Sequence, residues 1–448
     1  MRQIIVKLTF SVALLLLTTA ISFILPKLLT VENFGLYVYI QNVSFLFSNT
    51  IGAGVIQYFL KDKSDNSSLN LWRHSSAVFF ISSVLSILFL YFSKSYELGF
   101  LDLLIGAIAI CLVSNFELKS KYSDKINKTT ETESIKLMSK GLILSVIFVV
   151  FKIGDFNLTI YFEILIVVYL IATTLLLKVQ KNDDHVEVSK YNLIDITRYQ
   201  KFYIMPVLLG SYFVFLARDS IVTNEGLQEL ARFGLSYNIS WMVVPIFSSL
   251  FSIVVSRLVK DKNDVTATEM FSRIYNSIFL FVAVYSIIIF QWIECLVLLL
   301  YKGKYQNIDI IVLLLSLYAL FTVVNTILQA FYIRGNREGN YNRIMTVTYI
   351  LSIFLMIIND YIKIVNINAI NAALVLTVVS ALRHTYLLYI CNLKSIIIRN
   401  LAVLVILYLL SVFFTPITST LLALSLLILS IMFMFRYQLS NSASKYFA

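Results

Sequence analysis

The sequence predicts an all-α integral membrane protein with about 14 transmembrane helices. Hydrophobic residues make up 59% of the 448 positions and charged residues 14%, a composition more apolar than a water-soluble domain needs. Successive stretches of about 16 to 28 mainly apolar residues are each long enough to cross, or nearly cross, about 30 Å of hydrocarbon as a helix. The third observation is that lysine and arginine gather in the short connectors between these stretches. The predicted spans are residues 4–25, 36–60, 75–93, 98–118, 137–151, 158–177, 202–217, 234–256, 274–300, 308–333, 344–360, 369–391, 400–414 and 416–435.

The distribution of basic residues predicts the orientation of these spans. With a cytoplasmic N-terminus, 26 of the 36 lysines and arginines fall in cytoplasmic connectors and termini and 8 on the opposite side. This bias follows the positive-inside rule and predicts an even number of spans with both termini in the cytoplasm. The first span has the charge pattern of a secretory signal, but its removal spoils the alternation, so we expect it to be retained. The net charge of +11 thus reflects topology and not a nucleic-acid surface.

An internal repeat predicts two halves of the same orientation. When the chain is shifted by 199 residues, Phe34-Gly35-Leu36 falls on Phe233-Gly234-Leu235, and a basic turn follows one long span in each copy. Because six spans per half is an even number, the two halves are parallel repeats that enclose a central cavity. We expect an N-terminal six-helix lobe at 1–178, a cytoplasmic linker at 179–201, a C-terminal six-helix lobe at 202–391, and an additional two-helix segment and tail at 392–448.

The sequence contains no pattern typical of an enzyme. It has no metal-binding histidine or cysteine cluster, no nucleophile elbow and no phosphate-binding loop, and every outward connector is short. The three cysteines lie inside spans, and each of the three histidines is expected to be solvated or internally hydrogen-bonded. We therefore expect neither an enzymatic activity nor a cofactor or metal.

Ionisable residues within or at the ends of spans are the candidates for function, because a charge in lipid is costly and usually faces a cavity. Arg218 and Asp219 end the seventh span, Lys140 and Arg383 lie inside the fifth and twelfth, and Glu163 lies near the outer end of the sixth. Snorkelling or a local ion pair is the alternative for each of them. A guanidinium suits a two-pronged grip on phosphate.

Several short motifs carry a resemblance to a known family. The run Leu28–Tyr37 resembles the first loop of polysaccharide (O-antigen or capsule repeat-unit) flippases, with an acidic residue before Phe-Gly and a following Tyr. Arg218-Asp219 with the later Ala231-Arg232-Phe233-Gly234 resembles that family's seventh-helix segment and following loop. The turn Tyr301–Tyr305 resembles its Gly-x-x-Tyr turn. The family belongs to the multidrug/oligosaccharidyl-lipid/polysaccharide (MOP) exporter superfamily.

The resemblance implies a flippase that moves undecaprenyl-diphosphate-linked oligosaccharides from the cytoplasmic to the outer leaflet of the bacterial inner membrane by alternating access. Arg218 and Arg383, with Lys140 as a weaker third, are then expected to bind the diphosphate. Asp219 or Glu163 is expected to bind a coupling proton or sodium ion. A polysaccharide polymerase and a chain-length regulator are the partners that the family implies, besides the lipid-linked cargo and the bilayer.

Two other functions stay open at this point. A drug/cation antiporter of the same superfamily is expected to have acidic cavity residues and a less basic lining. An O-antigen polymerase or membrane glycosyltransferase is expected to have a large outer loop or an acidic catalytic motif, and no connector supplies either. The first span has no basic residue between Lys7 and Lys27 and so departs from the first-helix arginine cluster of lipid II flippases in the same superfamily. By that resemblance, a peptidoglycan precursor is not the expected cargo.

Overall fold

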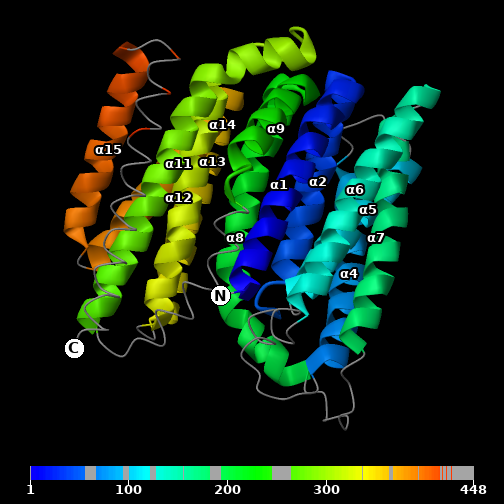
Figure 1. Ribbon diagram of the computed structural model, residues 1–448, viewed down its shortest axis with the longest axis horizontal. Helices are drawn as coiled ribbons and strands as arrows, with labels where there is room; N and C mark the ends of the chain where they lie inside the picture. The colour runs from blue at the N-terminus through cyan, green and yellow to red at the C-terminus, as the bar shows by residue number, and fades with distance from the viewer. Residues whose placement is uncertain are drawn as a thin grey trace. The chain divides into compact units, whose positions relative to one another are not determined.

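The computed structural model describes most of the chain as α-helix. The described residues are 2–55, 67–93, 100–121, 128–154, 156–181, 193–244, 264–334, 337–362, 367–391 and 393–413, with three isolated positions beyond them. Within these ranges the structure has thirteen helices and no strand. The predicted all-α fold is confirmed (Figure 1). The predicted final span, 416–435, lies almost wholly outside the described residues.

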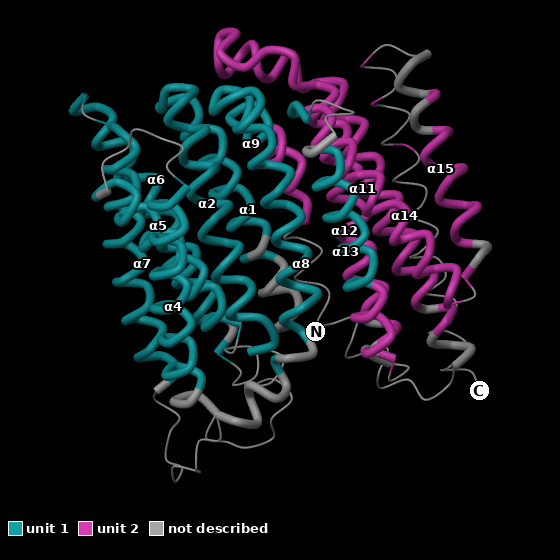
Figure 2. The backbone as a smooth tube through the Cα atoms, turned by 180° about the vertical axis from the view of Figure 1, so that it is seen from behind, with its two compact units in different colours: residues 1–235, 345–369 teal, residues 236–344, 370–448 magenta. Residues whose placement is uncertain are grey.

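The helices form two compact units, coloured separately in Figure 2. Unit 1 comprises residues 1–235 and 345–369. Its helices are α1 (Arg2–Leu28), α2 (Val31–Ile51), α4 (Ser67–Phe92), α5 (Phe100–Ser120), α6 (Thr129–Ile153), α7 (Leu158–Lys181) and α8 (Leu193–Glu225), with the start of α9 (Leu227–Trp241) and most of α13 (Glu338–Ile362). Within this unit α2 packs against α4, α5 and α8, which places it at the centre of the helix contacts.

Unit 2 comprises residues 236–344 and 370–448. It holds the end of α9, the start of α13, and the helices α11 (Asp264–Tyr301), α12 (Asp309–Arg334), α14 (Ala369–Ile390) and α15 (Lys394–Phe413). α11 packs against both α12 and α15. The lobe boundaries expected from the repeat stay a prediction.

The outer faces of the helices are apolar. Nine of the described helices contain a segment long and apolar enough to cross a membrane. Large hydrophobic side chains on them are exposed, among them Phe80 (68%), Ile153 (72%) and Leu299 (74%). A protein in water rarely shows so much apolar surface, whereas lipid is its natural contact. The structure is that of a multi-pass membrane protein.

The start of α2 is fixed by local chemistry. The Thr30 hydroxyl oxygen accepts a hydrogen bond from the Asn33 backbone N–H at 3.1 Å, and Glu32 lies in the first turn. An N-cap hydroxyl satisfies a backbone donor that has no partner inside the helix, and an acidic residue there complements the helix dipole. The acidic Phe-Gly motif of the sequence therefore begins a helix.

The two copies of the repeated Phe-Gly motif lie on helices that touch. A Cβ on Gly35 of α2 would lie 2.1 Å from the backbone oxygen of Leu227, at the start of α9. A Cβ on Gly234 of α9 would lie 2.4 Å from a methyl carbon of Val38 on α2. Each glycine thus lets the other helix approach more closely than any larger residue allows.

Candidate substrate site

Arg218 is buried where α8 packs against α2. Its side chain is 5% exposed, and its Nη1 donates a hydrogen bond to Oδ1 of Asn42 at 3.3 Å. Its guanidinium carbon lies 5.7 Å from the centre of the Phe233 ring, within the range of a cation–π interaction. Both of these contacts are with neutral groups, an amide oxygen and an aromatic face, that favour a cation.

Asp219 faces the same helix one turn away from that contact. Its Oδ1 accepts a hydrogen bond from the Tyr39 hydroxyl at 3.3 Å, and the side chain is half-buried. Tyr39 and Asn42 are three residues apart and therefore share one face of α2. The predicted Arg218–Asp219 pair thus forms one polar cluster with Tyr39 and Asn42, which we call the α2–α8 cluster.

Lys140 belongs to the same unit but has a different set of neighbours. It lies on α6, with its Nζ 5.7 Å from the centre of the Tyr169 ring. Tyr37 and Glu117 are further groups with which its charge interacts. Aromatic rings and one carboxylate thus surround this lysine, which is the pattern of a partly buried cation held by π faces.

Arg383 lies in unit 2, on α14. It is 4% exposed, and its Nη2 donates to the Ser380 hydroxyl oxygen at 3.3 Å, one turn earlier on the same helix. The next residue, His384, is 2% exposed. A buried arginine inside a membrane-spanning segment is expensive. A role of Arg383 in binding stays a prediction.

Glu163 is placed differently from the other candidates. It lies on α7 with an exposed side chain, between the buried Phe162 and Ile164. An exposed carboxylate on a helix face lacks the enclosed surroundings that give a coupling group its selectivity. Of the two predicted ion-coupling residues, Asp219 therefore has the better position.

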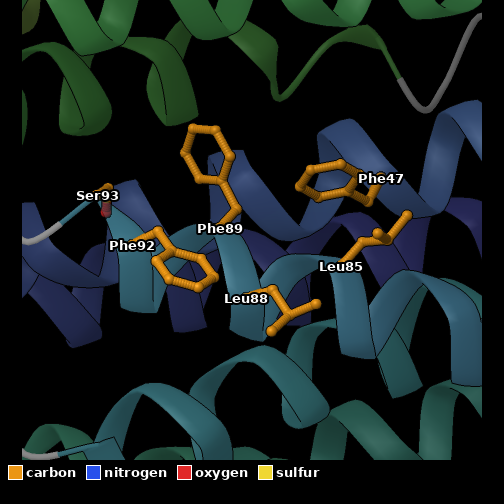
Figure 3. Close-up of a pocket in the computed structure, with 6 residues that line it drawn as sticks. All are labelled: Phe47, Leu85, Leu88, Phe89, Phe92 and Ser93. Atoms are coloured by element: carbon orange, nitrogen blue, oxygen red, sulfur yellow. The ribbon is translucent and has the colours of Figure 1, made fainter.

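An apolar pocket of about 430 Å³ lies in unit 1 (Figure 3). Its lining comes from α2 and from the end of α4: Phe47, Leu85, Leu88, Phe89, Phe92 and Ser93. The Phe89 ring meets the Phe215 ring of α8 edge to face, at 5.3 Å between centres. Phe215 is one helical turn before Arg218, so the two side chains lie on the same side of α8.

The Tyr301–Tyr305 turn that resembles the flippase family has a well-defined conformation. Lys302 and Gly303 have φ angles of 51° and 82°, which is the left-handed region that glycine tolerates best. The Tyr301 and Tyr305 rings pack edge to face at 5.3 Å. Burial lowers the pKa of the Lys304 amine, whose Nζ lies 5.7 Å from the Tyr305 ring. The turn is a packed structural element.

Asn42 and Tyr39 were not predicted as site residues, and Phe233 was noted in the sequence only as part of the repeated motif. Asn42 carries the only usable signal, because a buried amide in the middle of an apolar helix needs a polar partner. No group of three or more His, Cys, Asp or Glu side chains that could bind a metal occurs in the part of the chain that the structure describes.

No protein-family model matches the sequence, and a search of curated proteins finds no match. Solved structures do match. The lipid II flippase MurJ, in an inward closed conformation, aligns with 97% of this chain and 99% of its own at 13% identity and a TM-score of 0.66. An inward-facing multidrug resistance MATE transporter of the MOP superfamily aligns over 87% and 95% at 11% identity, with a TM-score of 0.59. A mutant of the Vibrio cholerae MATE transporter VcmN aligns over 86% and 95% at 11% identity, with a TM-score of 0.57. The chain has the fold of MOP-superfamily transporters and flippases.

Proposed function

We propose that this protein is a flippase for undecaprenyl-diphosphate-linked oligosaccharides, which it moves from the cytoplasmic to the outer leaflet of a bacterial inner membrane. The cargo would serve O-antigen, capsule or exopolysaccharide assembly, with both termini of the protein in the cytoplasm. The fold is that of membrane transporters and flippases, and the choice of cargo rests on the site and on the resemblance of the sequence motifs.

The observation that carries this proposal is a buried arginine, Arg218, on the helix whose Phe215 packs against the wall of an apolar pocket. Arg218 is buried, and Phe215, one helical turn before it, contacts Phe89 in the wall of a pocket lined almost entirely by hydrocarbon. A lipid diphosphate has the matching chemistry, since it joins an anionic head to a long apolar chain. A guanidinium holds diphosphate oxygens with two parallel hydrogen bonds, and an apolar wall accepts the chain without loss of hydrogen bonding.

The proposed roles follow from charge and burial. Arg218 and Arg383 would bind the diphosphate, and Lys140 would add a weaker contact. Asp219 would bind the coupling proton or sodium ion, and Glu163 is the less favoured alternative because it is exposed. Binding of the head group in an enclosed cationic site and its release on the other side would constitute alternating access. A polymerase and a chain-length regulator would act on the cargo after release.

A drug/cation antiporter is the second candidate. It is supported by the structural similarity to MATE transporters and by the half-buried Asp219, which could exchange a proton for a cationic drug. The buried Arg218 argues against it, because a fixed positive charge disfavours a cationic substrate at the same cluster. The O-antigen polymerase alternative has no observation in its favour.

Deletion of the gene, with complementation by variants, tests the proposal. We expect lipid-linked repeat units to accumulate in the cytoplasmic leaflet of the deletion strain and wild-type plasmid to restore export. Arg218→Ala and Arg383→Ala should each fail to restore it while inserting normally. Arg273→Ala is the matched control, because the Arg273 side chain is 41% exposed and its ion pair with Glu269, at 3.5 Å, is also on the surface.

The alternatives give different results in the same strains. Repeat units that cross normally but stay unpolymerised would indicate a polymerase. An unchanged glycan together with altered drug resistance would indicate the antiporter. Wild-type export by both arginine variants would contradict the site assignment.

A further inference from the structure

Four buried polar side chains from four helices form a chain of hydrogen bonds in unit 2. Asn400 of α15 donates through Nδ2 to the Tyr275 hydroxyl of α11 at 2.7 Å. That hydroxyl lies 2.5 Å from His384 Nε2 of α14, and His384 Nδ1 lies 2.8 Å from Asn325 Oδ1 of α12. All four residues are at most 7% exposed. The sequence predicted a solvated or internally bonded histidine at 384, and the structure shows the bonded alternative inside the helix bundle.

The partners determine the direction of every hydrogen bond in this chain. Asn325 Oδ1 can only accept, so His384 Nδ1 carries the hydrogen and Nε2 is left as an acceptor. The Tyr275 O–H must then donate to Nε2, and the Tyr275 oxygen accepts from Asn400. The arrangement is complete only with a neutral imidazole.

A proton on Nε2 disrupts this order. The Tyr275 oxygen would then face two N–H donors, and its own hydrogen would have to turn away from His384. The structure gives the Tyr275 hydroxyl no third partner among the described residues. A buried hydroxyl hydrogen without an acceptor is costly.

The charged groups around His384 also disfavour a positive charge on its imidazole ring. Arg383 precedes it on α14, and Arg399 of α15 interacts with Tyr275. On α12 the neighbours are Asn325 and the Phe321 ring, 5.6 Å away, and on α13 the Tyr341 hydroxyl reaches the Asn325 backbone oxygen at 3.4 Å. The titratable groups facing this position are thus tyrosines and arginines, and among the described residues the hydrogen bonds and ring contacts of His384 involve no carboxylate.

We propose that His384 is a proton-binding site and that its protonation opens the Asn400–Tyr275–His384–Asn325 chain, releasing α15 from α11. In the closed arrangement His384 does not take up a proton, whereas in an open arrangement, where water reaches the ring, it does. Proton uptake must therefore shift the population toward the open arrangement. The chain thereby makes the packing of α15 sensitive to pH. A role of His384 in coupling protons to transport extends the proposed function and rests on it. Proton binding by His384 and the opening of the hydrogen-bond chain do not rest on it.

Hydrogen–deuterium exchange on the purified full-length protein in nanodiscs, without cargo, tests this directly. The readout is the protection of peptides from α15, compared between variants at the same pH so that the intrinsic exchange chemistry cancels. For wild type we expect the open fraction to rise as pH falls from 7.5 to 5.5, by at most about tenfold per pH unit for a single proton. Peptides from α7 in unit 1 serve as an internal reference.

His384→Gln removes the titratable group, so its α15 protection should not depend on pH relative to that reference. His74→Gln is the matched control, because His74 is also buried but lies on α4 of unit 1, and it should respond as wild type does. Tyr275→Phe should expose α15 at both pH values, because it removes the central hydroxyl while leaving the histidine.

Asn325→Asp tests the proposal independently of His384→Gln. A carboxylate opposite Nδ1 favours the imidazolium, so the transition should move to higher pH. A wild-type protein without pH dependence, or a His384→Gln variant that keeps it, overturns the proposal. If His384→Gln does not fold, an unchanged transition in Asn325→Asp overturns it. None of these results depends on the cargo. A negative flippase assay therefore does not contradict the proton site, and a negative exchange experiment does not contradict the proposed flippase function.

Discussion

Gly234 of α9 packs so closely against Val38 of α2 that no additional carbon atom fits between them. A Cβ at position 234 would be 2.4 Å from one methyl carbon of Val38 and 3.0 Å from the other. The reciprocal glycine, Gly35, faces the backbone of Leu227. Gly35 and Gly234, which the internal repeat aligns, therefore both lie in the contact between α2 and α9. This explains why the repeat keeps glycine at both, and it gives the Phe-Gly motif a packing role besides any role in transport.

Gly234→Ala should destabilise the protein by about 1 to 3 kcal/mol, the usual cost of overpacking. Gly35→Ala should cost at least as much, because its Cβ meets the backbone oxygen of Leu227, which cannot rotate away. Thermal unfolding followed by size-exclusion chromatography in detergent measures both. Gly141→Ala is the control: nothing lies within 4 Å of its Cβ position, and alanine is the better helix former there.

Val38→Ala should recover part of the stability lost in Gly234→Ala, since it removes the two methyl groups that the new Cβ meets. The double-mutant cycle isolates this contact. Independent, additive effects of the two substitutions would show that the packing of α2 on α9 differs from the one described.

The fold was predictable because it depends on quantities that a sequence carries directly. A membrane helix needs about 20 apolar residues in a row, and lipid imposes that length whatever the neighbouring helices do. The positions of Arg218, Asp219, Lys140 and Arg383 were predictable for the same reason, since charge within an apolar stretch is visible in one dimension.

The partners of these charges were not predictable. Asn42 and Arg218 are 176 positions apart, and only the packing of α8 on α2 brings them to 3.3 Å. The chain centred on His384 likewise joins four helices whose mutual rotation is set by side-chain packing. The exposure of Glu163 is a third case, because an apolar helix shows weak periodicity and does not reveal which face meets lipid.

Asn42→Asp should separate the structural role of Arg218 from its role in binding. A carboxylate in place of the amide would form an ion pair with the guanidinium and occupy the groups that we expect to hold the diphosphate. We predict loss of export in the complementation assay with a thermal stability equal to or above that of wild type. Asn42→Ala should instead lower stability by about 1 to 3 kcal/mol, because it leaves a buried donor without this acceptor. Full export by Asn42→Asp would contradict the proposed role of Arg218.

Thr30→Val should lower stability by about 1 kcal/mol, because it removes the hydroxyl that caps α2 at the Asn33 backbone N–H while keeping the size of the side chain. Thr30→Ser retains the cap and should behave as wild type. Export per folded molecule should be unchanged in both, since Thr30 contacts the helix start and not the α2–α8 cluster. Thermal unfolding measures the stability of the variants, and complementation at matched expression measures their export.

The orientation of the chain can be tested at the turn between α8 and α9. Only Gly226 separates these helices, and its φ of 85° reverses the chain there. The charge bias predicts that this turn lies outside and the C-terminus inside. Alkaline phosphatase fused after Gly226 should therefore be active, and green fluorescent protein fused after Ala448 should be fluorescent. Because Gly226 follows seven predicted spans and the C-terminus follows fourteen, signals from opposite sides require an odd number of spans between the two points. A dark C-terminal fusion with an active Gly226 fusion would mean that one of the predicted spans after α8 does not cross the membrane, and the pair at 400–414 and 416–435 would be the first to examine.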